Sequence, residues 1–447
     1  MRWGWLISGL AVACSGGVDG GDGNANLGGE ESTGTGGPAG STSSAGTGTS
    51  SPSITSTGTG DSTDPSTTVG DPSGSDTSSG SEATGEPSCD ENWRVQPVNF
   101  GLTDVAYDAA TDTVYAVGND DGTPWAASLD GCNGDTITLT GVNHQGATST
   151  NLRRVLSSPE GLFVAGSLVN NNDPGNGLYA RLDPETLDLV WSQGLVGGGG
   201  LVDEVLELTV SNAGGVWMAG TARVGANPVP WTISGTVDGP ACGFSAGTPG
   251  AGSARALATD GDTVVVAMRL DAGGVVLLGY DEACTCMCTP DWTSPTIEIG
   301  QGNTSIGDMI AVDGQFYVAG WADDGVSADL YGYVAWLDGN GTLLGTYTDD
   351  VTPTGEGFTT MVAVGGTVYL GGAQAWDGQP GFEGANARMQ ALAIPFGGGA
   401  PAAEWTTLPQ QLDIVQGIDA SNQHLFVGGN SDGVATVLRC DLAGNCG

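Results

Sequence analysis

The stretch Phe316-Tyr317-Val318-Ala319-Gly320 decides the fold, because close variants of it recur along the chain. Each copy is a short apolar strand that usually ends in glycine. Before each copy comes another strand, which carries a polar residue, and a turn joins the two strands. Seven such pairs follow one another, and their polar residues lie 50 to 56 positions apart. Units of this length built from short strands are typical of β-propeller blades.

The other copies support the same unit. A third strand follows each pair, as in Tyr179–Asp183, and a fourth often carries tryptophan, as in Val190-Trp191. No apolar period of 3.6 residues runs through this part of the chain, which excludes an α-solenoid. The seven second strands read Val114–Gly118, Leu162–Gly166, Val216–Gly220, Val264–Met268, Phe316–Gly320, Val368–Gly372 and Leu425–Gly429.

The two ends of the repeat region complement each other. The seventh unit stops after its third strand, Thr436–Cys440, and an unassigned strand, Asn92–Val95, precedes the first unit. Placing the early strand in the last blade closes the ring and removes an exposed sheet edge. We therefore predict an all-β, seven-bladed β-propeller over residues 89–447, closed by the N-terminal strand.

The first residues predict export. Residues 1–13 hold Arg2 and an apolar run that is too short to span a bilayer, which indicates a signal peptide. The sequence Leu10-Ala11-Val12-Ala13-Cys14 resembles the lipobox of bacterial lipoproteins, although Ala11 stands where that family usually has leucine. The resemblance implies that Cys14 is lipidated, and Ser15 after it implies the outer membrane. An ordinary signal peptide on a secreted, soluble protein is the alternative.

Residues 14–88 read as a lipidated cysteine followed by a stalk. The segment is built of Gly, Ser, Thr, Pro and Asp, and it contains ten carboxylates and no basic residue. Such a composition offers no apolar surface to offset the entropy lost on ordering. We predict a disordered linker with a reach of about 45–50 Å.

Two repeat elements carry a further resemblance. Tyr317-Val318-Ala319-Gly320 and Leu337-Asp338-Gly339-Asn340-Gly341 resemble repeats of secreted bacterial propeller lipoproteins, which are loosely similar to kelch and quinoprotein propellers. The resemblance covers residues 89–447. It implies a fold and no particular activity, because one fold hosts many functions.

Eight cysteines remain besides Cys14, and an even number in an exported chain favours disulfides. We expect two bonds within each of two groups, with one bond joining Cys89 to the seventh blade. The run Cys284-Thr285-Cys286-Met287-Cys288 is also compatible with a Cu(I) site, which an oxidising compartment disfavours. The groups are Cys89, Cys132, Cys440 and Cys446, and Cys242, Cys284, Cys286 and Cys288.

The polar residue of each first strand is the main site candidate. A propeller's first strand lines its central channel, so these side chains are expected to form a ring at the channel mouth. The ring has a structural interpretation, a set of salt bridges that fixes the blades, and a functional one, an anion or polyol site built on Arg154 and Arg255. The candidates are Asp104, Arg154, Glu204, Arg255, Asp308, Thr360 and Gln416.

Other motifs for chemistry are sparse. The chain has two histidines, His144 and His424, on different blades, and it has neither a His-Glu-x-x-His motif nor a P-loop. The turns Asn119–Gly122 and Asn170–Asp173 are rich in oxygen ligands for Ca²⁺. Asn, Asp and Gly are also the ordinary residues of hairpin turns, so we predict that the protein binds no metal or other cofactor. Binding of Ca²⁺ at these turns is the alternative. We name no catalytic residue.

The charge of −41 comes from 51 acidic residues and ten arginines, without lysine. It excludes nucleic-acid binding through a basic surface. Residues 89–447 hold 41 of the acids and nine of the arginines, so the folded domain carries most of the charge, which suits a saline exterior.

These features predict a monomeric binding or scaffold module that is tethered to a membrane and contacts an extracellular protein or glycan. The alternative is a secreted enzyme acting in the channel, either a quinoprotein-like dehydrogenase or a hydrolase or lyase.

Overall fold

A computed structural model describes the chain from Cys89 onward. The described residues are 89, 92–120, 122–170, 173–195, 201–224, 227–237, 239–245, 251–284, 288–300, 303–323, 325, 330–350, 355–375, 385–393, 400–409 and 412–446. The predicted signal peptide and stalk therefore lie outside the described residues.

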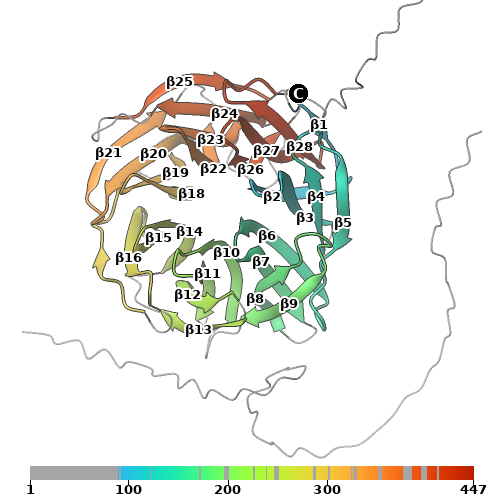
Figure 1. Cartoon of the computed structure of the whole chain (residues 1–447). Helices are drawn as coiled ribbons and strands as arrows, with labels where there is room; N and C mark the ends of the chain where they lie inside the picture. The colour runs from blue at the N-terminus through green and yellow to red at the C-terminus, as the bar shows by residue number, and fades with distance from the viewer. Residues whose placement is uncertain are drawn as a thin grey trace, which may run out of the picture. The chain divides into compact units, whose positions relative to one another are not determined.

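The described residues form seven antiparallel sheets of four strands, arranged in a ring around one axis (Figure 1). Each sheet is one blade, and in blades one to six the strands run in chain order from the axis outward. Blades one to three comprise β2 (Gly101–Asp108), β3 (Thr113–Asp120), β4 (Thr123–Asp130) and β5 (Thr136–Gly141); β6 (Ser149–Ser158), β7 (Gly161–Asn170), β8 (Asp173–Leu182) and β9 (Leu189–Leu195); and β10 (Leu201–Val210), β11 (Gly215–Val224), β12 (Asn227–Thr236) and β13 (Gly239–Ser245).

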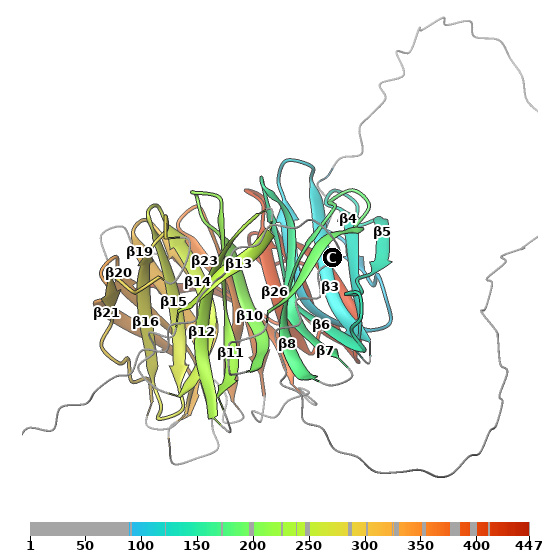
Figure 2. The ribbon, with the colours of Figure 1, turned by 90° about the horizontal axis from the view of Figure 1, so that it is seen from below.

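Blades four to seven repeat this plan, and the sideways view in Figure 2 shows the blades standing side by side around the ring. Their strands are β14 (Gly252–Asp260), β15 (Thr263–Leu270), β16 (Val275–Asp281) and β17 (Trp292–Thr293); β18 (Thr304–Val312), β19 (Gln315–Asp323), β20 (Leu330–Asp338) and β21 (Leu343–Asp349); β22 (Glu356–Val364), β23 (Thr367–Gln374), β24 (Asn386–Ala393) and β25 (Ala402–Thr407); and β26 (Ile414–Ala420), β27 (His424–Ser431), β28 (Val434–Asp441) and, from the other end of the chain, β1 (Arg94–Val95).

The ring closes as the sequence predicts. Strand β1 pairs with β28, so the outermost strand of the seventh blade comes from the N-terminal side of the domain (Figure 1). The pairing joins Arg94 to Leu438 and Val95 to Val437. Trp93, beside β1, is buried, and its indole N–H donates to the carbonyl of Gly131 in blade one at 3.1 Å. The closing strand therefore contacts both blades that meet at the seam.

A β-bulge recurs in the inner strand of every blade. In blade one it falls between Leu102 and Asp104, so Thr103 is the extra residue. The bulge explains the repeat glycine, because a Cβ on Gly118 would lie 2.0 Å from the carbonyl oxygen of Gly101. The same carbonyl approach recurs at the second-strand glycines Gly166, Gly220, Gly320, Gly372 and Gly429.

The hydrophobic cores lie between neighbouring blades. One cluster, for example, joins Tyr115 and Val117 of blade one to Val164 and Leu178 of blade two. Tryptophans of the third strands are buried in these layers, as in Trp231, which is fully covered. Packing of this kind holds each blade against the next by burial of apolar surface.

Candidate site at the propeller axis

Strand register identifies the side chains around the axis. In blade one, Asp104 lies opposite Val117, the residue before the repeat glycine. The corresponding position in each blade defines what we call the axial ring. Its members are Asp104, Arg154, Glu207, Ala256, Asp308, Thr360 and Gly417.

Three of the predicted ring residues are not members of the axial ring. Strand β10 has two bulges, and they place Glu207 opposite Ala219 while Glu204 pairs with Thr221 further along. In β14 and β26 the polar residues Arg255 and Gln416 are the extra residues of the bulge. Of the predicted residues, Asp104, Arg154, Asp308 and Thr360 are members of the axial ring.

Arg154 is the centre of the axial ring. Its Nε lies 2.8 Å from Glu207 of blade three, and its Nη1 lies 3.8 Å from Asp104 of blade one. Its Nη2 donates to the carbonyl of Gly307 in blade five at 3.5 Å. A guanidinium that contacts blades one, three and five must lie across the axis, so at this level the axis is filled by a salt-bridged side chain.

The ring side chains also join adjacent blades directly. The Asp104 carboxylate accepts a hydrogen bond from the N–H of Val155 at 3.0 Å, in the next blade. Asp308 accepts one from Met361 at 2.8 Å in the same way. Two residues beyond the ring position of blade seven, Asp419 accepts a hydrogen bond from the N–H of Tyr107 at 2.7 Å. These hydrogen bonds join the inner strands of neighbouring blades.

The ring carboxyls are hard to ionise. Asp104 is only 7% exposed, and burial raises its pKa to about 7 against the lowering effects of Arg154 and the Val155 N–H. Burial likewise raises the pKa values of Glu207 and Asp308, although Arg154 lowers both. For Arg154 itself, burial lowers the pKa, but Glu207 and Asp104 more than compensate and raise it overall.

We expect the stability of the domain to fall as pH rises from about 4 to about 7. An unfolded Asp104 loses its proton near 3.8, whereas the folded one does so at about 7. Between these values the folded state holds the extra proton, so its advantage is complete below the lower value and is lost through the upper one. Urea denaturation at a series of pH values measures the slope, which is about 1.4 kcal/mol per pH unit for one proton.

Asp104→Asn is the matched control for this pH dependence. The amide keeps a carbonyl oxygen for the Val155 N–H but does not titrate. We expect a shallower slope in the variant, measured at high salt so that repulsion among surface carboxylates is screened. Equal slopes in both proteins would contradict a pKa near 7 for Asp104.

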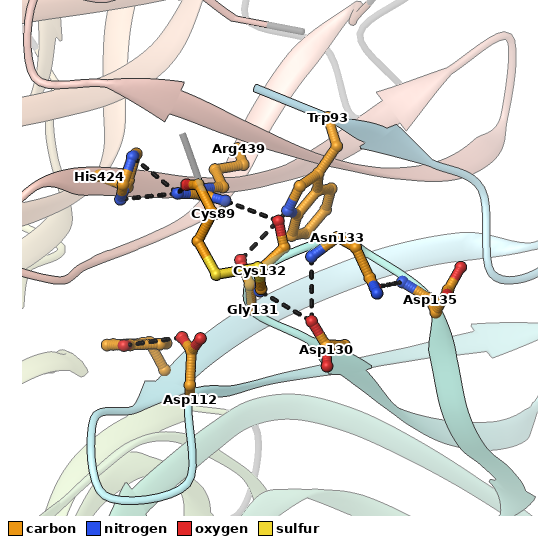
Figure 3. Close-up of a disulfide and its surroundings, with 11 residues drawn as sticks. Cys89, Trp93, Asp112, Asp130, Gly131, Cys132, Asn133, Asp135, His424 and Arg439 are labelled. Carbon is orange, nitrogen blue, oxygen red and sulfur yellow. Dashed lines mark hydrogen bonds between the residues drawn. A yellow bond between two sulfur atoms is a disulfide. The ribbon is translucent and has the colours of Figure 1, made fainter. Parts of the chain in front are cut away.

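The two histidines lie in separate surroundings. His144 Nδ1 is 2.8 Å from the hydroxyl of Ser192, and burial lowers the pKa of His144. His424 begins β27 and is hydrogen bonded to the Arg439 guanidinium, with Nε2 at 2.8 Å. Figure 3 shows His424 and Arg439 beside the disulfide at the closure seam.

The candidate calcium turns are described only in part. In the first, Asn119 uses its side chain to bind the carbonyl and N–H of Leu152 at 2.8 and 2.7 Å, which links blades one and two. Asp121, Asn171, Asn172 and the side chains of Asn170 and Asp173 lie outside the described residues. For Asn119 the structure thus gives a role in packing between blades.

The described cysteines pair within the expected groups, with one difference. Cys89 bonds to Cys132 of blade one, with Cα atoms 4.7 Å apart, so the expected link to the seventh blade is wrong (Figure 3). Cys440 bonds instead to Cys446, six residues away in the same blade. Both blades flank the seam, so the sequence pattern alone does not distinguish the partners.

In the second group of cysteines Cys284 bonds to Cys288. That bond uses two of the three thiols that the copper interpretation requires. Cys286 and the side chain of Cys242 lie outside the described residues.

A cavity of about 430 Å³ lies at the closure seam, between the turns of blades seven and one. Tyr107, Asp112, His424 and Arg439 contribute to its lining. Arg439 connects its walls, because the guanidinium donates to the carbonyl oxygens of Cys132, at 2.7 Å, and of Cys89. Sequence reasoning missed this cavity, since its lining residues come from distant segments of the chain.

The sequence also contains one motif that is typical of hydrolases. Gly243-Phe244-Ser245-Ala246-Gly247 matches the Gly-x-Ser-x-Gly pattern of hydrolases. In those enzymes the serine occupies a sharp turn between a strand and a helix. Here Ser245 ends the outer strand β13 and pairs with Thr232 in an antiparallel ladder.

Within the described part of the chain, no three His, Cys, Asp or Glu side chains are grouped closely enough to hold a metal ion. The same residues include no helix with the length and hydropathy of a membrane span.

Comparison with known proteins adds little to this picture. No family model and no curated protein matches the chain. Among solved structures, one described as the Dos1 propeller is similar, with a TM-score of 0.46 and 12% sequence identity over 77% of this chain and 79% of that one. The pairing of the 28 described strands therefore establishes the fold: a seven-bladed β-propeller.

Proposed function

We propose that the protein is an exported, lipid-anchored propeller that acts as a binding or scaffold module outside the cell. Three features of the chain support this proposal. The sequence ending at Cys14 has the form of a lipoprotein signal, residues 15–88 have the composition of a stalk, and three disulfides lie in the described domain. Disulfides persist in oxidising compartments, so they are compatible with export.

One observation supports a binding module more than any other. The polar groups around the axis join blades to one another, as Asp104 does to Arg154 and to the N–H of Val155. Contacts of this kind between blades make the propeller rigid. A rigid domain presents a preorganised binding surface, which loses little conformational entropy when a partner binds.

Cys14→Ser tests the anchor. When the full chain is expressed in a bacterium with an outer membrane, we expect wild type in the membrane fraction and the variant in the soluble exported fraction. The thioether to the cysteine is the attachment point for the lipid, and a serine cannot form it. Ser15→Ala is the matched control and should stay with the membrane. Equal partition of wild type and Cys14→Ser would overturn the anchor.

The binding role has a separate test. We expect the purified full chain to bind at least one extracellular glycan or protein on an array with a saturable, specific signal. Chain that has been reduced and denatured is the control, since a folded surface is required. Signals that are equal for native and denatured chain, or absent throughout, would contradict a binding module.

An enzyme at the axis is the second candidate, and the raised pKa values of Asp104 and Glu207 favour it. Carboxyls that titrate near neutrality are suited to general acid catalysis. Such an enzyme would be a hydrolase or lyase, because Arg154 is already bound to carboxylates and is not available for a quinone. Turnover on a glycoside panel that disappears in folded Asp104→Asn would establish it.

A further inference from the structure

Three arginines lie together at one end of the axial ring, over blades two to four. Arg153 and Arg255 are the bulge residues immediately before the ring positions of β6 and β14. Arg269 of β15 pairs with Ser253, which stands near the same end of β14. Directly opposed residues in an antiparallel pair project from the same face of the sheet. The inner strands β6, β10 and β14 are neighbours around the axis (Figure 1).

These arginines have fewer acidic partners than their number requires. Arg153 Nε lies 2.5 Å from Glu204 of the next blade, so this pair is neutral. Arg255 Nε donates to the hydroxyl of Ser253 at 2.9 Å, which carries no charge. In the part of the chain that the structure describes, neither Arg255 nor Arg269 forms an ion pair with a carboxylate. Among the described residues, three arginines thus lie near one carboxylate, Glu204, which leaves a net excess of two positive charges.

The axial ring explains why Arg255 lacks a carboxylate. Blades one, three and five place an acid in the ring, but blade four places Ala256 there. Arg255 is largely covered, and burial together with repulsion from Arg269 and Arg153 lowers its pKa, although attraction to Glu204 acts in the opposite direction. A partly buried cation without a counter-ion is costly. The domain has 41 acidic residues, any of which could have supplied a carboxylate as the counter-ion of Arg255.

We propose that Arg255 and Arg269 bind a small oxyanion, the carboxylate of a sugar acid or a phosphate, at this end of the propeller axis. The proposal rests on the proposed binding function and names its ligand class. A guanidinium fork matches both groups through paired, charge-assisted hydrogen bonds. The axial ring closes the site on the inner side, since Arg154 crosses the axis there. The acidic remainder of the domain repels polyanions, which restricts the site to small ligands.

Calorimetric titration of the full chain at low ionic strength tests this site. One arm uses glucuronate and the other inorganic phosphate, and the arm that saturates identifies which source of the oxyanion is bound. We expect Arg255→Gln to weaken binding about tenfold or more, because it removes a charge-assisted bond. Arg269→Gln should do the same, and it keeps the test decisive should Arg255→Gln fail to fold. The matched control is Arg94→Gln, an exposed arginine on the closing strand, which should bind as wild type does.

Two results would overturn the site: no saturable heat in either arm, or equal affinity in wild type and in a folded Arg255→Gln or Arg269→Gln. A variant counts as folded when its thermal transition matches that of wild type. The outcome is separable from the test of the anchor. Oxyanion binding by a chain that is not membrane-bound would leave this site standing, and an anchored chain without oxyanion binding would remove the site alone.

Discussion

Arg154→Gln should lower the free energy of unfolding by about 3–5 kcal/mol, which is the cost of removing one partner from a buried ion pair. The substitution leaves Asp104 and Glu207 without the cation that both contact. It also removes the hydrogen bond that Arg154 makes across the axis to Gly307. Urea denaturation of both proteins at neutral pH measures the difference.

The adjacent arginine supplies the control. Arg153→Gln makes the same change in charge and size, but the Arg153 side chain is 51% exposed and its bond to Glu204 is a surface salt bridge. We expect it to cost about 0–1 kcal/mol. The deficit of Arg154→Gln should shrink at low pH, where the orphaned carboxyls are protonated. Equal losses for the two variants at neutral pH would mean that Arg154 does not organise the ring.

Loss of the Cys89–Cys132 bond should cost about 4 kcal/mol. The bond joins residues 43 positions apart, and the chain-entropy relation gives this value for a loop of that length. The variant is the double substitution Cys89→Ala and Cys132→Ala, compared with wild type by denaturation under oxidising conditions.

The internal comparison is the pair Cys440→Ala and Cys446→Ala. Their separation is six residues, so the same relation gives about 2.3 kcal/mol. The longer loop should therefore matter more, although both bonds lie in blades that flank the seam. A larger loss for the Cys440–Cys446 pair would show that loop closure does not govern these disulfides.

The blades and the closing strand could be predicted because they depend on local pattern. Alternation of short apolar strands with turns identifies each blade, and the missing fourth strand of the seventh unit identifies its substitute in β1. The candidate site could be predicted only in part. Asp104, Arg154, Asp308 and Thr360 lie in the axial ring, but Glu204, Arg255 and Gln416 do not.

The misplaced residues share one physical cause. A β-bulge adds a residue to one strand, and a shift of one position moves a side chain to the other face. Nothing in the composition of β14 shows whether Arg255 or Ala256 opposes Ala267. Counting from the second strand gives a usable signal, because the ring residue opposes the position before the repeat glycine. Glu207, opposite Ala219, would have been found in this way.

The Cys89–Cys132 bond also determines how the domain would respond to mechanical tension. A pull on the chain before Cys89 reaches that residue first, and the covalent bond passes the force to the turn between β4 and β5 of blade one. Strand β1, which pairs with β28 through only two residues, is thereby bypassed. Without the bond, the same force would peel β1 from β28 one hydrogen bond at a time, and the ring would open at its seam. The disulfide therefore protects the pairing of β1 with β28 from a force that pulls on the chain before Cys89.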